Sequence, residues 1–195
     1  MARTMRWFAL GVLGMALLAA GCGNKEKDAT QAAIDAAQSA INSVQADAEK
    51  YVPEQLQAAQ RTLQSARDAL AKSDYQGALA AARDAANKAK EMAVEAVGKK
   101  EEWEKNWKEL NESLPKAMEQ VRYRVSLYSS KGVRLPEGVD KDVVDEAKAE
   151  YEQLKQRWAE ASELAKEGKL GEAIEKATGV KEGIEKIKEM LKIKT

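Results

Sequence analysis

Few residues in this chain could take part in covalent or metal chemistry. The sequence has one cysteine, Cys22, and no histidine. Nucleophile pairs of the Cys/His or Ser/His type, histidine zinc sites and a disulfide within the chain are therefore excluded. The 32 acidic residues are scattered, and neither an Asp/Gly calcium loop nor a Gly-rich phosphate loop occurs. We expect no enzyme activity, no metal and no cofactor, and the Cys22 thiol is the one group with an assignable reaction.

Cys22 follows an N-terminal segment that has the three parts of a signal peptide. Arg3 and Arg6 provide the positive start, residues 7–20 form an apolar stretch, and small residues precede the cysteine. This stretch is shorter than the roughly 20 apolar residues that a membrane-spanning helix needs. The sequence therefore predicts a cleaved signal peptide over residues 1–21.

The residues Leu18-Ala19-Ala20-Gly21-Cys22 resemble the lipobox of bacterial lipoproteins. Leucine is commonest three residues before the cysteine in that family, whereas this chain has Ala19 there and Leu18 one position earlier. The resemblance implies cleavage after Gly21, a diacylglycerol on the Cys22 sulfur and a membrane anchor of more than one acyl chain. Gly23 stands where retained inner-membrane lipoproteins of enteric bacteria tend to carry aspartate, so the resemblance implies an outer-membrane anchor and a chain that faces the periplasm. The alternative is an ordinary secretory signal that leaves Cys22 as a free thiol.

Beyond the signal, apolar residues recur at alternating steps of three and four, which predicts helices with heptad seams. Short turns between them favour pairing within the chain, although the oligomeric state stays open. The fold class is therefore all-α, with elongated antiparallel helical hairpins in a coiled-coil-like bundle of about five to six helices. The expected segments are a tether at 22–29, an alanine-rich helical hairpin region at 30–98, a connecting helix at 99–128, a loop at 129–139 and a second helical hairpin at 140–195.

Proline and one alternating stretch affect where these helices begin and end. Pro53 is well placed to begin a helix, where its missing N–H costs nothing, whereas Pro115 is expected to kink or restart one. Residues 121–127 also alternate apolar and polar side chains with the period of a strand. We favour a helix there, because the helical stripe is longer and no second strand exists to pair with it.

An offset of 95 residues superposes the two predicted hairpins without a gap, pairing Leu56 with Tyr151 and Ala78 with Ala173. Chance alignment of two heptad hairpins is the alternative to a repeat. The stretch 53–90, which contains ALAKSDYQGAL, is similar to a small helical-hairpin domain of unknown function found in Gram-negative envelope lipoproteins. That resemblance implies a helical, often lipid-anchored protein without an assigned activity. The turn also resembles the start of a tetratricopeptide unit, but those units recur about every 34 residues, so their peptide groove is not implied.

Two functional hypotheses follow from this sequence. Its 32 basic and 32 acidic residues are dispersed, so no nucleic acid is expected as a partner. The first hypothesis is a non-catalytic envelope protein that is held by its lipid and acts as a periplasmic helical spacer, scaffold or assembly partner for another envelope protein. The second is a peptide- or ligand-binding module with a patch of aromatic and arginine side chains, the types favoured at binding hot spots. The candidate residues are Trp103, Trp107, Arg122, Tyr123, Arg124 and Tyr128. For the two tryptophans, a place in the core stripe is the alternative.

Overall fold

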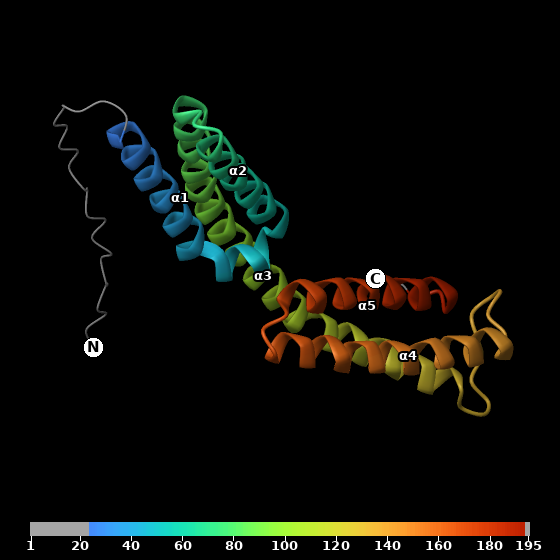
Figure 1. Cartoon of the computed structure of the whole chain (residues 1–195). Coiled ribbons are helices and arrows are strands. Elements are labelled where there is room, and N and C mark those ends of the chain that lie inside the picture. Colours follow the sequence, from blue (N-terminus) through green and yellow to red (C-terminus); the bar gives the residue numbers. More distant parts are fainter. Residues whose placement is uncertain (1–23, 194–195) are drawn as a thin grey trace, which may run out of the picture. The chain divides into compact units, whose positions relative to one another are not determined.

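The computed structural model describes residues 24–193, and all regular structure in that range is helical (Figure 1). The five helices of this part are α1 (Asn24–Tyr51), α2 (Pro53–Ala71), α3 (Tyr75–Tyr128), α4 (Lys141–Lys166) and α5 (Leu170–Met190). The predicted all-α class is confirmed. The described residues form two compact units, one of residues 24–46 and 53–91, the other of residues 47–52 and 92–193, so that α3 contributes to both.

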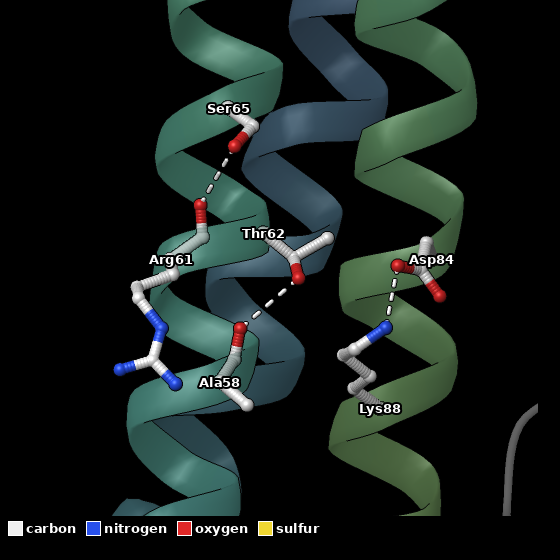
Figure 2. A network of polar contacts seen from close by, with 6 residues as sticks. All are labelled: Ala58, Arg61, Thr62, Ser65, Asp84 and Lys88. Carbon is white, nitrogen blue, oxygen red and sulfur yellow. Dashed lines mark hydrogen bonds and ion pairs between the residues drawn. The ribbon is translucent and has the colours of Figure 1, made fainter.

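The first unit packs α1, α2 and the beginning of α3 around a core made mostly of alanine. Small side chains let helix axes approach closely but bury little area each. Several polar side chains are satisfied within their own helices: Thr62 and Ser65 donate hydroxyl hydrogens to carbonyls four residues earlier, and Lys88 pairs with Asp84 (Figure 2). The buried residues are Thr30, Ile34, Ala37, Ile41, Leu56, Ala59, Leu63, Ala66, Ala78, Ala82, Ala85 and Ala89.

The second unit packs the rest of α3 with α4 and α5 around larger apolar side chains. Its fully enclosed residues include Val121, Leu154 and Ile184, each at most 1% exposed. Larger side chains bury more apolar area per residue, so this unit gains more from the hydrophobic effect than the alanine-rich one. The core residues are Leu114, Met118, Val121, Val125, Val139, Val144, Ala147, Tyr151, Leu154, Ala161, Ala177, Val180, Ile184, Ile187 and Leu191.

The turns after α2 and α4 have the same hydrogen-bonded geometry. Asp74 donates its backbone N–H to the Ala69 carbonyl at 3.0 Å, and Lys169 donates to Leu164 at 2.9 Å, which are the six-to-one bonds of a Schellman motif. The residue before each donor is left-handed, with φ of 61° at Ser73 and 78° at Gly168. These pairs of residues lie at the offset of 95 that the sequence comparison used.

In several pairs of residues that are 95 positions apart, both members are also buried. The first such pair along the hairpins is Leu56 and Tyr151, and the last is Ala96 and Leu191. Some buried alanines of the first hairpin correspond to larger residues in the second, as Ala85 does to Val180, and others correspond to alanine, as Ala82 does to Ala177. The two hairpins are therefore related in turn geometry and in burial pattern, which goes further than shared heptads require.

Two expected boundaries are wrong. The tether expected at 22–29 is helical from Asn24 onward within the described residues. Thr30, only 2% exposed, extends the α1 seam by one turn, and its hydroxyl donates to the Glu26 carbonyl at 2.7 Å. A polar residue that satisfies itself on its own helix can occupy a buried position, so hydropathy alone placed the start of the helix too late.

The second boundary lies within α3, where the sequence left open whether the helix continues past Gly98 and predicted a kink or a restart at Pro115; the restart is wrong. The helix continues through both positions. Gly98 is exposed, so its cost is limited to about 1 kcal/mol of helix propensity. Leu114 and Met118, which are 2% and 6% exposed, hold the helix against the core on both sides of Pro115. Residues 121–127 are helical, as favoured.

Candidate functional site

The six residues proposed as a binding patch all lie on α3 in the second unit, but they form two separate groups. Fifteen residues separate Trp107 from Arg122, which is roughly 22 Å along a helix. Such a distance is too great for one small ligand to contact both ends. The six residues therefore do not form one compact site for a small ligand, and a role in binding an extended peptide stays a prediction.

Both tryptophans pack against other side chains. The Trp103 ring meets Tyr51 edge-on, with centroids 5.3 Å apart. Trp107 stacks on Trp158, with centroids 5.6 Å apart and an angle of 20° between the rings, and both rings pack against the core. Aromatic pairs of this kind stabilise a fold by about 0.5–1.5 kcal/mol beyond the area they bury. These contacts support the core interpretation for Trp107, whereas Trp103 is half-buried and lies outside the core cluster.

Trp103 also lies directly over Gly171 at the start of α5, where a Cβ atom would be only 2.7 Å from the Trp103 ring. We expect Gly171→Ala to displace the ring and to lower the free energy of unfolding by about 1–3 kcal/mol. Tryptophan emission and thermal unfolding measure both effects. Gly179→Ala is the matched control on the same helix, because a Cβ there meets no atom within 4 Å. It should stabilise by about 0.5–1 kcal/mol, and equal effects of the two variants would contradict this account.

Arg122, Tyr123 and Arg124 point to different sides of α3, since successive helical residues are about 100° apart. Tyr128 lies about one turn beyond Arg124. Arg122 forms a bidentate pair with Glu119, with Nε to Oε2 at 2.8 Å, and this pair raises the pKa of Arg122 and lowers that of Glu119. Tyr123 is 61% exposed, Arg124 is exposed, and Tyr128 packs partly buried against the core. Arg122 is the member of this group that lines a hollow between two helices.

That hollow lies between the end of α3, the first residues after it and the middle of α4, with a volume of about 330 Å³. We call it the Arg122 hollow. Figure 1 shows the end of α3 running beside α4 there. Its lining combines cations, hydroxyls and one carboxylate: Arg122, Val125, Ser126, Ser129, Ser130, Lys148, Tyr151 and Glu152.

Tyr151 is a functional candidate that sequence reasoning missed, because it was assigned to the α4 seam. Its side chain is buried in the core, 8% exposed, yet its hydroxyl makes no hydrogen bond with residues 24–193. Burial raises the pKa of the Tyr151 phenol, while the nearby Arg122 charge opposes the shift. The hydroxyl therefore stays protonated at neutral pH and can donate. No buried side-chain nitrogen or oxygen in the described residues lacks a partner, so this hydroxyl is reached by solvent.

Comparisons with protein-family models, curated proteins and solved structures find no match.

Three larger hollows lie in the second unit, and one of them, of about 670 Å³, is lined by charged and amide side chains of α4 and α5. The second, of about 560 Å³, borders Trp103 and the start of α5 and includes Lys50, Gly171 and Glu172. The third, of about 810 Å³, runs along α3 and α5 with Leu110, Ala117 and Ile174 among polar neighbours. The second and third have balanced or mixed charges, so neither favours one class of ligand.

Cys22 lies outside the described residues, so its lipidation stays a prediction. Within residues 24–193, no cluster of three or more acidic, histidine or cysteine side chains could hold a metal ion. None of the helices in this range combines the length and apolar character needed to cross a bilayer.

Proposed function

We propose that this protein is a non-catalytic, lipid-anchored protein of the bacterial envelope that acts as a helical spacer, scaffold or assembly partner. The anchor is the lipid on Cys22, held in the outer membrane, and the helical units extend into the periplasm. The observation that carries the proposal is the lipobox-like sequence ending at Cys22, two residues before α1 begins at Asn24.

This proximity supports a mechanical role for the anchor. A helix that starts two residues after a lipidated cysteine would have its first turn close to the membrane surface. Helices are suitable spacers because their backbone hydrogen bonds are satisfied internally and their length is fixed at about 1.5 Å per residue. At that rise, the 26 residues of α4 extend about 39 Å.

The partner in this proposal is another envelope protein. The chain has no histidine and a single cysteine, which supports binding and holding over catalysis. Most ion pairs on the surface of the described residues join side chains three or four apart on one helix, as Lys155 does with Glu152. Such exposed pairs are worth little to folding and leave a hydrated surface of both charge signs.

Gene deletion with complementation tests the proposal. Loss of the protein should weaken the envelope, seen as entry of a large antibiotic or as altered cell shape. The full chain should restore the wild-type state, whereas an equally abundant chain exported without its lipid should not. Unchanged envelope permeability, cell shape and protein complexes after deletion would contradict a scaffold role, and full rescue by the unlipidated chain would contradict the anchor.

A further inference from the structure

We propose that the Arg122 hollow binds a small organic anion that carries hydroxyl groups, of about the size of one monosaccharide with a carboxylate or phosphate group. This goes beyond the scaffold function and does not depend on the anchor. All the lining residues belong to the second unit, so the site is complete within it.

We infer that the ligand carries a negative charge, because two cationic side chains from different helices line the hollow. Lys148 of α4 makes no hydrogen bond or ion pair with any residue of the described range. Arg122 of α3 uses its Nε and Nη2 atoms on Glu119, and a guanidinium has five N–H donors, so others remain. The one carboxylate in the lining, Glu152, is paired with Lys155 at 3.2 Å. The hollow therefore has a net positive lining, and charge-assisted hydrogen bonds to an oxyanion are its strongest possible contacts.

We infer from the hydrogen-bonding state of the serines in the lining that the ligand carries hydroxyl groups. Ser129 donates to the Val125 carbonyl at 2.7 Å and Ser130 donates to the Ser126 carbonyl at 3.0 Å. Since each hydroxyl has a single hydrogen, these oxygens can only accept further bonds. Donor groups on the ligand can satisfy these two acceptors. The free Tyr151 hydroxyl adds one donor on the opposite wall. A polyol suits this mixture, because each of its hydroxyls both donates and accepts.

The size of the hollow limits the ligand. Pockets that hold small molecules range from about 300 to 1,000 Å³, and this one, at about 330 Å³, is at the lower end. A single sugar ring with one charged group fits such a volume, whereas a chain of several rings would extend beyond it.

Isothermal titration calorimetry on the mature, detergent-solubilised chain tests the inference, with glucuronate and glucose 6-phosphate as probes and glucose and inorganic phosphate as comparisons. We expect at least one anionic sugar to bind with a dissociation constant of about 1 mM or below, as is typical for ligands of this size. That sugar should bind roughly tenfold more tightly than glucose or phosphate, because it alone satisfies both the cations and the serine oxygens. Equal binding of glucose, equal binding of phosphate, or no heat with either anionic sugar from a folded chain would each overturn the proposal.

Variants assign the binding to this hollow. Arg122→Ala and Lys148→Ala should each weaken it by roughly tenfold, and Tyr151→Phe, which keeps the buried ring, by a few-fold. Arg124→Ala is the matched control: it removes an exposed arginine of the same helix that does not line the hollow. Circular dichroism verifies that each variant is folded. Unchanged affinity in both Arg122→Ala and Lys148→Ala, or an equal loss in Arg124→Ala, would overturn the site.

Discussion

Replacing Cys22 by serine should abolish lipid attachment and, once the signal is made cleavable by another route, release the chain from the membrane. The sulfur is the atom that the lipobox resemblance marks for diacylglycerol, and a serine hydroxyl cannot take its place. Each buried methylene contributes about 0.8 kcal/mol, so one acyl chain binds reversibly and two or more hold a protein firmly. We therefore expect a change from nearly complete membrane association to nearly complete release.

The measurement needs two variants, because an unprocessed signal peptide could itself keep the chain at the membrane. In the first, Cys22→Ser alone, incorporation of a labelled fatty acid should be lost. In the second, Cys22→Ser is combined with exchange of residues 1–21 for an ordinary secretory signal, and the mature chain should be recovered in the periplasmic fraction. Gly23→Ala is the matched control and should keep its label. Labelling of Cys22→Ser, or membrane retention of the second variant, would show that the anchor lies elsewhere.

The heptad seams could be predicted from the sequence because burial on a long helix follows from apolar period alone. Ile34, Leu63 and Ile184 are buried where the pattern of threes and fours placed them. The turn after α2 was also predictable, since Ser73-Asp74 leaves too little chain for any path but a reversal.

The errors came from residues whose local preference is overruled by packing. Pro115 is a poor helix former, but a single such residue costs only about 3 kcal/mol, and a long helix bound to a core can absorb that. Thr30 was missed because its polarity is satisfied on its own helix. Local propensity therefore gives the elements but not where they end.

The candidate site was the least predictable feature, because it depends on which helix faces meet. Arg122 was chosen from its neighbours in sequence, Tyr123 and Arg124, whereas its neighbours in space are Lys148 and Tyr151 of α4. Nothing in the pattern of α4 distinguishes Tyr151 from an ordinary core residue. Its hydroxyl is a functional candidate only because the helix packing leaves that end of the side chain open.

Leu154→Ala should lower the stability of the second unit by about 2–5 kcal/mol, the largest folding effect we expect from a single substitution. Leu154 is fully buried and packs over Gly183 of α5, where a Cβ would collide with it. Truncation leaves a cavity between α4 and α5 that the surrounding helices can only partly close. A loss of this size corresponds to a fall in the melting temperature of roughly 10 °C or more for a unit of about 100 residues.

Tryptophan fluorescence isolates this effect, because Trp103, Trp107 and Trp158 all belong to the second unit. Leu63→Ala is the matched control, since Leu63 is equally enclosed, at 3% exposed, but belongs to the first unit. It should lower part of the helix signal in circular dichroism and leave the tryptophan transition nearly in place. If both variants moved both signals together, the two units would unfold as one cooperative structure, and stability would have to be assigned to the whole chain. If the two signals change at different temperatures, the alanine-rich unit should melt first, because its small side chains bury less apolar area per residue than those of the second unit.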